Sequence, residues 1–490
     1  MRSRVSAEAG RSVGNVRVWR LCFSLLLSAA LVSCGGEGKP ATPPRPALPY
    51  LGAVVSPEPI AGQIARQVLA EGGDAADAAV TLGFALAVSL PSRAGLGGGG
   101  ACLAYAPSRS APGSGRPEAI LFLPASPLPG GQGGDRPAAV PMLARGLYLL
   151  HARYGRLPIE QLVGEAQKMA RLGVRVSPRL ADDIAAVAGP LLADPAARAV
   201  FTNPSGSPLA VGDGLFQPDL ANTLSELRLD GLSNFYQGSL AQRLAEAATA
   251  AGGGLTEADF ARAIPSLATP IELRAGVNRV AFLPAPADGG LAAAAAFAEL
   301  QKNPADLAGA AERALAVATR WRAGGVSGEA VLAAPTLPPA TLPPLPASTA
   351  FATLDNSGGA VACAVTMNNL FGTGRIAPGT GVLLAAAPGT GPLPLLAASI
   401  AWNNNIHAFR AAVAGSGQNQ AAIATALGMA GALSSRTLEP LQLPEPGAAQ
   451  VISCGRFLPG NTGTCSAAVF PPSSGGSAFS GTYGLPARGS

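Results

Sequence analysis

Residues 346–384 constrain the fold of this chain more than any other stretch, because short apolar runs alternate in it with turn residues. The runs 350–354 and 360–365 flank an Asn-Ser-Gly-Gly turn. Short apolar runs joined by a glycine-containing connection are typical of a β-hairpin. Two hydroxyl residues, Ser348 and Thr349, stand at the start of the first run, directly after a proline-rich segment. The stretch therefore predicts a hairpin that opens with hydroxyl side chains.

This stretch resembles the start of the small subunit in the gamma-glutamyltranspeptidase family. In that family a Thr-Thr-His run opens a strand, Thr-x-Asn lies on the paired strand, and Phe-Gly-(Ser/Thr)-Gly and Pro-Gly-(Thr/Ser)-Gly motifs follow. The spacing here holds without a gap, which makes the match specific. The matching segments are Ser348-Thr349-Ala350, Thr366-Met367-Asn368, 371–374 and 378–384.

A second match to the family lies at residues 72–79, which read GGDAADAA, and at 95–100, which read GLGGGG. A phosphate-binding loop is excluded, because such loops run from strand through glycines to helix. Here a helical pattern precedes the glycines and an apolar strand pattern, 101–105, follows them. We expect the glycines to permit close backbone packing against a neighbouring strand.

The resemblance covers most of residues 50–435 and implies the fold. It is an α+β fold, the four-layer αββα sandwich of the N-terminal-nucleophile hydrolases, with two stacked sheets and helices outside. Charged residues make up only 13% of the chain, and alanine and glycine are abundant, which suggests closely packed layers of small residues. Periodicity predicts helices over 59–71, 75–90, 291–300 and 308–321, and two more within 140–180.

The same resemblance divides the chain. We expect a large-subunit-like region over 50–333, an exposed polyproline-type linker over 334–347, and a small-subunit-like region over 348–465. Residues 466–490 are rich in serine, glycine and proline and are expected to form a mobile tail.

In that family the chain is cut just before the first hydroxyl residue, which becomes the nucleophile and uses its own α-amine as base. Such an amine has a pKa of about 8, so a useful fraction is unprotonated at neutral pH. The resemblance thus implies catalysis by Ser348, with Thr366 hydrogen-bonding the nucleophile and Asn368 contacting the substrate. Gly415 and Gly417 align roughly with a segment whose glycine amides form the oxyanion hole.

This mechanism requires no histidine. The sequence contains only His151, in a helical pattern, and His407, in a polar turn, so a histidine-based triad would have to use one of them. No Cys-x-x-Cys or histidine cluster indicates a metal site, and no cofactor is expected. The alternative for Ser348, a strand-edge serine in an uncut chain, stays open.

The substrate-binding positions depart from the family pattern. The arginine that grips the substrate α-carboxylate falls at Leu123, and the serine pair that contacts it falls at Leu396-Ala397. Residues 385–388 replace an acidic segment that holds the substrate amino group. A leucine cannot replace a bidentate guanidinium. We therefore expect an apolar pocket, lined by Leu123, Leu396 and Ala397, that prefers an uncharged acyl group to γ-glutamate.

Two functions are compatible with these residues. The first is a self-cleaving amidase or transpeptidase acting on a small-molecule amide or peptide. The alternative is a catalytically silent lipoprotein that keeps the fold as a binding or scaffold module. The formal charge is +5, but residues 1–33 carry +4 of it, so the remainder gives no electrostatic case for nucleic acid.

The first residues indicate export. A basic segment ends at Arg20, and the apolar run 21–31 is too short to span a bilayer and fits a signal peptide. Residues 31–34, Leu-Val-Ser-Cys, resemble a bacterial lipobox. We expect lipidation at Cys34, a flexible tether over 34–49 and a place in the cell envelope facing the periplasm. Ordinary signal cleavage, with Cys34 as a bystander, is the alternative.

Cysteines of an exported protein can form disulfides. Cys454 and Cys465 are expected to close a short loop, which stabilises by roughly 3 kcal/mol in the chain-entropy model. Cys102 and Cys363 lie in apolar strand patterns and are expected to be buried hydrophobic residues without such a bond.

Overall fold

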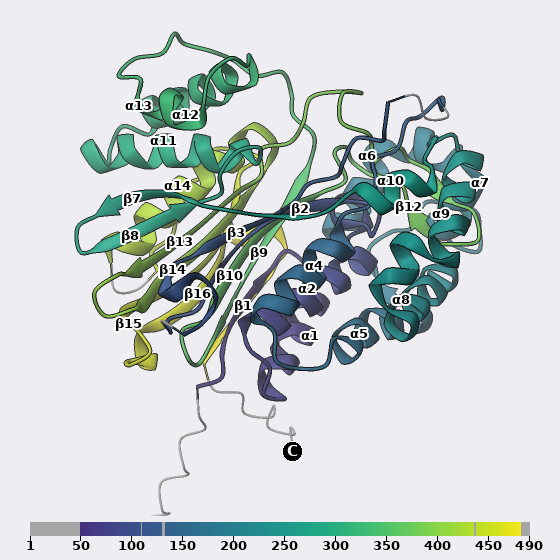
Figure 1. The fold of residues 1–490 in the computed structure, drawn as a ribbon, viewed down its shortest axis with the longest axis horizontal. Coiled ribbons are helices and arrows are strands. Elements are labelled where there is room, and N and C mark those ends of the chain that lie inside the picture. The colour runs from purple at the N-terminus through teal and green to yellow at the C-terminus, as the bar shows by residue number, and fades with distance from the viewer. Residues whose placement is uncertain (1–49, 109, 130–132, 436–437, 482–490) are drawn as a thin grey trace, which may run out of the picture. The chain divides into compact units, whose positions relative to one another are not determined.

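Two β-sheets stack face to face, and helices cover the outer face of each (Figure 1). The computed structural model describes residues 50–108, 110–129, 133–435 and 438–481. All strand pairs within the two sheets are antiparallel. The arrangement confirms the predicted α+β, four-layer αββα sandwich of the N-terminal-nucleophile hydrolase type.

The first sheet has seven strands in the order β17-β1-β9-β10-β2-β3-β6. Their bounds are β1 (Gly52–Ser56), β2 (Gly99–Tyr105), β3 (Glu118–Phe122), β6 (Ser266–Ala268), β9 (Ser348–Asp355), β10 (Ala360–Thr366) and β17 (Ser477–Gly481). The second sheet has six, in the order β16-β15-β14-β13-β8-β7. These are β7 (Ile271–Ala275), β8 (Asn278–Phe282), β13 (Ala397–Asn403), β14 (Ala408–Ser416), β15 (Ala448–Leu458) and β16 (Cys465–Phe470).

The helices form two groups. Those on the side of the first sheet include α1 (Pro59–Ala70), α2 (Ala75–Ser89), α3 (Pro91–Ala94), α4 (Leu143–Tyr154), α5 (Ile159–Leu172), α6 (Pro178–Leu192), α7 (Pro195–Phe201), α8 (Pro218–Gln237), α9 (Ser239–Ala250) and α10 (Glu257–Arg262). Those on the second sheet are α11 (Asp288–Lys302), α12 (Leu307–Arg322), α13 (Gly328–Ala333) and α14 (Ala421–Ser434). The predicted helices are all present, with ends within a few residues of the expected ones.

Strand alternation divides the core into layers. In β9, Phe351 packs with the helices of the first group, whereas Ala350 and Ala352 belong to the layer between the sheets. In β14, Ala412 and Ala414 meet them from the second sheet. Small side chains between the sheets let the two backbones approach closely, as the composition suggested.

The glycine run at 95–100 fixes the place of β10 against its neighbours. A Cβ atom on Gly97 would collide with the carbonyl oxygen of Leu383, one on Gly98 with that of Thr366, and one on Gly99 with that of Phe122. Only glycine allows backbones to lie this close. The predicted role of the run, close packing against a neighbouring strand, is confirmed.

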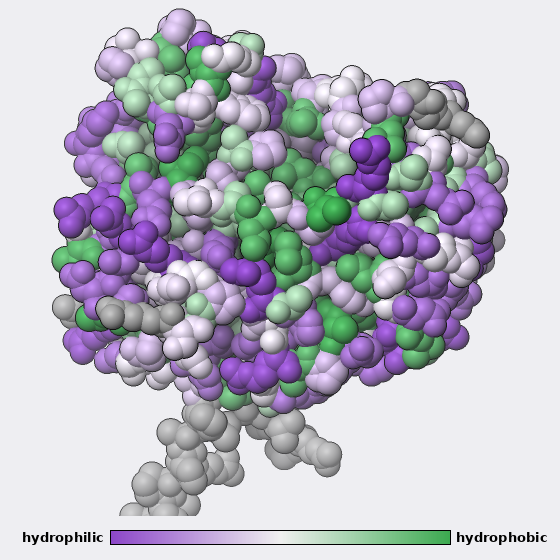
Figure 2. Space-filling model, in the orientation of Figure 1, coloured by the Kyte–Doolittle hydropathy of each residue, from purple (hydrophilic) through white to green (hydrophobic). Residues whose placement is uncertain are grey.

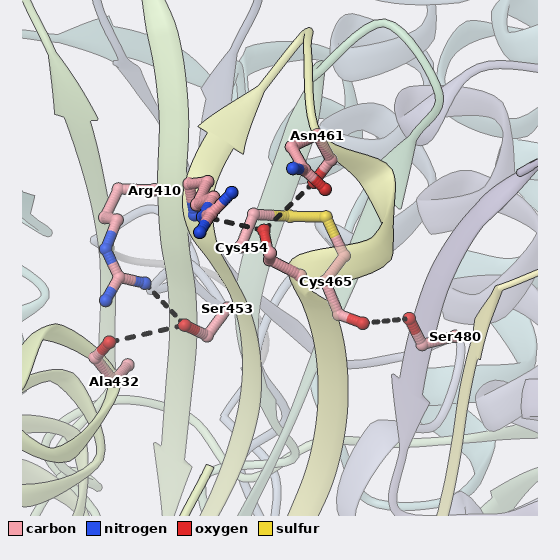
Figure 3. The surroundings of a disulfide bond; sticks show 9 residues. Arg410, Ala432, Ser453, Cys454, Asn461, Cys465 and Ser480 are labelled. Carbon is pink, nitrogen blue, oxygen red and sulfur yellow. Dashed lines mark hydrogen bonds between the residues drawn. A yellow bond between two sulfur atoms is a disulfide. The ribbon is translucent and has the colours of Figure 1, made fainter. Parts of the chain in front are cut away.

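Two expectations are wrong. Cys102 and Cys363 are paired opposite each other on β2 and β10 and form a disulfide. Their apolar surroundings are real, but cross-strand pairing brings the two thiols together, and the separation of 261 residues hid this. The expected Cys454–Cys465 disulfide is also present (Figure 3).

Residues 466–481 do not form a mobile tail. Residues 466–470 continue β16, and β17 pairs along the whole of β1. The Ser480 hydroxyl also donates to the carbonyl oxygen of Cys465, at 3.2 Å (Figure 3). Both strands lie at sheet edges, where small and polar residues are tolerated because one side faces solvent. Residues 482–490 lie outside the described part of the chain, as do Cys34 and the segments 1–33 and 34–49.

Within the described residues, none of the helices combines the length and the apolar character that crossing a bilayer requires.

Candidate active site

The β9–β10 hairpin brings Ser348 and Thr366 together. Ser348 is the first residue of β9 and is paired directly with Thr366, the last residue of β10. The turn is held by the Asp355 carboxylate, which accepts hydrogen bonds from the backbone amides of Ser357 and Gly359. The hairpin register therefore places both hydroxyl residues at one end of the first sheet, and both are buried.

The Thr366 hydroxyl contacts the peptide bond that precedes Ser348. It donates a hydrogen bond to the carbonyl oxygen of Ala347, at 3.1 Å, and accepts one from the backbone amide of Asn368, at 2.9 Å. The Ser348 hydroxyl is buried and has no hydrogen-bond partner among the described atoms. The expected hydrogen bond between Thr366 and Ser348 is not formed in the uncut chain, because the Thr366 proton goes to Ala347.

A cleft of about 500 Å³ opens beside these residues. Ala347 and Asn368 line it from the side of the hairpin, and Gly417 lines it from the end of β14. Asn368 has a positive φ of 57°, and its side-chain amide donates to the carbonyl oxygen of Ala386, at 3.0 Å. This bond fixes the orientation of an otherwise strained residue at the edge of the cleft.

Three charged residues, which we call the charged wall, line the cleft: Arg93, Arg179 and Asp183. The Arg93 guanidinium holds the Asp183 carboxylate through two bonds, Nε to Oδ2 at 2.7 Å and Nη2 to Oδ1 at 2.6 Å. Its Nη1 also donates to the carbonyl oxygen of Ser348, at 3.4 Å. The wall is therefore attached directly to the strand that begins with Ser348.

The end of the linker is docked. Leu345 is 1% exposed and belongs to the core beneath α11 and α14. Its backbone amide donates to Asn419 Oδ1, at 2.9 Å, and Asn419 Nδ2 donates to the carbonyl oxygens of Leu342 and Pro343. Residues 334–347 have no helix or strand, as predicted, but their last residues are held in place rather than exposed.

The two glycines expected in the oxyanion hole lie in different surroundings. Gly417 lines the cleft, with a φ of 108°. Gly415 lies inside β14, between Ala397 on one side and Ala449 on the other, so its amide belongs to the sheet ladder. A Cβ atom there would collide with α14, so Gly415 permits close packing of that helix.

The residues expected to form an apolar pocket do not line this cleft. Leu123 borders a separate hollow of about 390 Å³, together with Leu121 and Ile264. Figure 2 shows hydrophobic side chains gathered on this face between the positions of β3 and α10. Leu396 and Ala397 are buried in the core. Equivalent positions along the chain do not ensure equivalent positions around the cleft.

Both histidines lie outside the cleft. The His151 Nε2 atom lies 2.6 Å from the carbonyl oxygen of Leu157, and His407 occupies the turn between β13 and β14. Among the described residues, no group of three His, Cys, Asp or Glu side chains could hold a metal ion.

Sequence reasoning missed the charged wall. Arg179 and Asp183 are spaced i, i+4 on α6, which places them on one helix face. Arg93 stands two residues before the glycine run. These signals were present, but the contact between α3 and α6 crosses 90 residues and no local pattern predicts it.

The comparisons with known proteins agree with this architecture. The family model described as Gamma-glutamyltranspeptidase matches residues 61–318. The glutathione hydrolase proenzyme of Bacillus subtilis (strain 168) is 32% identical over 296 residues, which is 56% of this chain and 50% of that protein. The Acylase ACY 1 proenzyme of Pseudomonas sp. (strain SE83) is 34% identical over 245 residues, 46% of this chain and 43% of that protein. The chain thus spans about half the length of the curated relatives it matches.

Solved structures extend the similarity of the fold. The cephalosporin acylase from Bacillus halodurans superposes with a TM-score of 0.70 at 20% identity, covering 91% of this chain and 99% of that one. The gamma-glutamyltranspeptidase of Helicobacter pylori gives a TM-score of 0.52 at 25% identity, covering 60% and 94%. With more than half of its residues matched by the family model, the chain belongs to the gamma-glutamyltranspeptidase family.

Proposed function

We propose that this protein is a self-cleaving amide hydrolase or acyltransferase that uses Ser348 as its N-terminal nucleophile. One observation carries the proposal. The buried Ser348 hydroxyl stands without a hydrogen bond beside a cleft, while the carbonyl of the preceding peptide bond is bound by Thr366. A hydroxyl donor on a carbonyl oxygen stabilises the negative charge that develops there during nucleophilic attack.

The self-cleavage step follows from these contacts. Ser348 Oγ attacks the carbonyl carbon of Ala347, the peptide C–N bond breaks, and the Ser348 nitrogen takes up the hydroxyl proton. The resulting ester is hydrolysed by water, which leaves a carboxylate on Ala347 and a free α-amine on Ser348. With Ala347 released, the Thr366 hydroxyl becomes available to hydrogen-bond Ser348 Oγ.

Turnover repeats the attack on an external amide. The Ser348 α-amine takes the hydroxyl proton as Oγ bonds to the substrate carbonyl carbon, and the proton passes to the departing amine. Water, or a second amine, then takes the acyl group. We assign substrate contact to Asn368 and a place in the oxyanion hole to the Gly417 amide, since both residues line the cleft. Gly415 is assigned a packing role.

The substrate class is a small amide or peptide. The relatives are named a glutathione hydrolase and an acylase, so both γ-glutamyl and other acyl amides are reasonable test compounds. The purified protein is incubated with a panel of acyl anilides, and release of the aniline is followed. We expect turnover by the wild type and its loss, by at least about 10³-fold, in Ser348→Ala.

Ser399→Ala is the matched control, because Ser399 is also a buried strand serine without a hydrogen-bond partner among the described atoms. It should keep wild-type activity. An uncut wild-type chain that hydrolyses none of the anilides would contradict the proposal and favour the catalytically silent binding protein.

We also propose that the protein is anchored in the cell envelope by a lipid on Cys34. The proposal is supported by the basic and apolar leader that ends in Leu-Val-Ser-Cys34. Cys34→Ala should move the protein from the membrane fraction to the soluble periplasmic fraction. Unchanged fractionation would contradict lipidation.

A further inference from the structure

The charges that line the cleft do not balance. Of its three charged residues, Arg93 and Asp183 form a closed ion pair, and the Ser92 hydroxyl donates a further bond to Asp183 Oδ2, at 2.7 Å. Both side chains of that pair are well shielded, at 15% and 6% exposure. A carboxylate that already accepts three short bonds has little capacity left to neutralise a second guanidinium. Arg179 therefore gives the cleft an excess of positive charge.

The other acid near Arg179 does not fully cancel this charge. Glu58 is buried, and its carboxylate accepts a hydrogen bond from Ser177, at 2.7 Å. Burial raises the pKa of Glu58 to about 7, against the opposing effects of Ser177 and Arg179. Near neutral pH this carboxyl group is only partly ionised. Loss of hydration, and then the charge of Arg93, lower the pKa of Arg179, so an added anion would stabilise its charged form.

The cleft also has a defined chemical side. Residues 344–347 line it, and in self-cleavage these residues form the acyl side of the bond that Ser348 attacks. The acyl group of an external substrate must likewise lie next to Ser348 Oγ, beside the same cleft. The charged wall therefore faces the acyl part of the substrate.

From these observations we infer that the cleft is a carboxylate-binding site, with Arg179 as the ligand-binding cation and the Arg93–Asp183 pair as its rigid support. The substrate is then an amide whose acyl chain ends in a carboxylate, such as a monoamide of a short dicarboxylic acid. This inference rests on the proposed function and reverses the expectation of an uncharged acyl group. A guanidinium suits this role because it binds a carboxylate through two parallel hydrogen bonds.

The test compares carboxylates with matched neutral compounds. Succinyl, glutaryl and adipyl anilides are each paired with their methyl esters, and kcat/KM is measured with the purified full-length protein. We expect at least one free acid to exceed its ester by about 10-fold or more. Arg179→Gln should abolish this preference, and Arg179→Lys should retain part of it. Equal rates for acid and ester, or a preference that survives in Arg179→Gln, would overturn the inference.

Arg171→Gln is the control, because Arg171 is an exposed arginine at the end of α5 that contacts only Asn222 among its printed bonds in the described chain. It should leave the preference unchanged. Thermal unfolding of each variant verifies folding. Arg93 is left intact, because its removal would strand the buried Asp183 charge.

A binding measurement separates this inference from the proposed function. Glutarate and its monoamide are titrated calorimetrically into Ser348→Ala and into Ser348→Ala/Arg179→Gln. Glutarate binding that weakens by 10-fold or more with Arg179→Gln supports the site even if no anilide is hydrolysed. Hydrolysis without acid preference and without glutarate binding would leave the proposed function standing and reject the carboxylate site.

Discussion

The β9–β10 hairpin and the charged wall of the cleft serve one site but are assembled differently. The hairpin takes Ser348, Thr366 and Asn368 from one continuous stretch, and its register alone sets their relation. The charged wall joins α3 to α6 through an ion pair between residues 90 positions apart. The comparison teaches that the chemistry of bond cleavage is encoded locally, whereas the recognition we propose depends on the tertiary assembly of distant elements.

The largest expected effect tests the hairpin. Thr366→Val removes the hydroxyl that donates to Ala347 and should slow self-cleavage by about 10²–10³-fold, as expected for the loss of one donor to a developing oxyanion. The cut fraction is followed over time on reducing gels. Thr353→Val is the control, because Thr353 is also buried in β9 but donates to Ala75, away from the cleavage site. Equal rates in the two variants would contradict the role of Thr366.

The next prediction tests the surroundings of the charged wall. Because burial raises the pKa of Glu58 from 4.5 to about 7, the folded protein holds a proton that the unfolded chain releases between these values. Raising the pH through this window therefore favours unfolding, and the group costs about 3 kcal/mol of stability above pH 7. Below pH 4.5 it costs nothing.

Glu58→Gln should remove this loss, so its free energy of unfolding should fall less than that of the wild type between pH 4.5 and 7.5. Glu71→Gln, at the exposed end of the same helix, should follow the wild-type profile. Chemical denaturation at a series of pH values measures both. Parallel curves for wild type and Glu58→Gln would contradict the buried, partly protonated carboxyl group.

The smallest expected effect concerns the backing of the hairpin. Gly99→Ala places a methyl group against the backbone of β3 and should cost about 1–3 kcal/mol of stability. Gly189→Ala, at an open position on α6, should be neutral or slightly stabilising. Urea denaturation compares the two variants. Comparable stability of both would show that the glycine run is not packed as tightly as described.

The sequence was informative wherever structure depends on near neighbours. The hairpin, the capped helix α2 and the glycine run follow from turn residues, an N-cap at Asp74 and spacing, all of which act over a few residues. The pairing of Ser348 with Thr366 could therefore be predicted, and with it the location of the site.

The sequence was misleading where distant segments meet. Cys102 and Cys363 looked like separate buried thiols, and only the order of strands in the sheet makes them partners. Residues 477–481 looked like a tail because an edge strand can be polar. Leu123 occupied the position of the family's arginine, yet the cleft carries Arg179 from another helix. Each error concerned a long-range contact.

The Cys102–Cys363 disulfide makes a direct test of the central claim possible. Cys102 precedes the proposed cut and Cys363 follows it, so the disulfide links the two products. The intact mass of purified wild type is measured with and without reductant, beside Ser348→Ala.

The account predicts one species without reductant, heavier by one water than the uncut chain after allowing for the substitution. Reduction should separate it into two chains, one ending at Ala347 and one beginning at Ser348, while Ser348→Ala stays a single chain. A wild-type protein that remains one uncut chain after reduction would contradict the account.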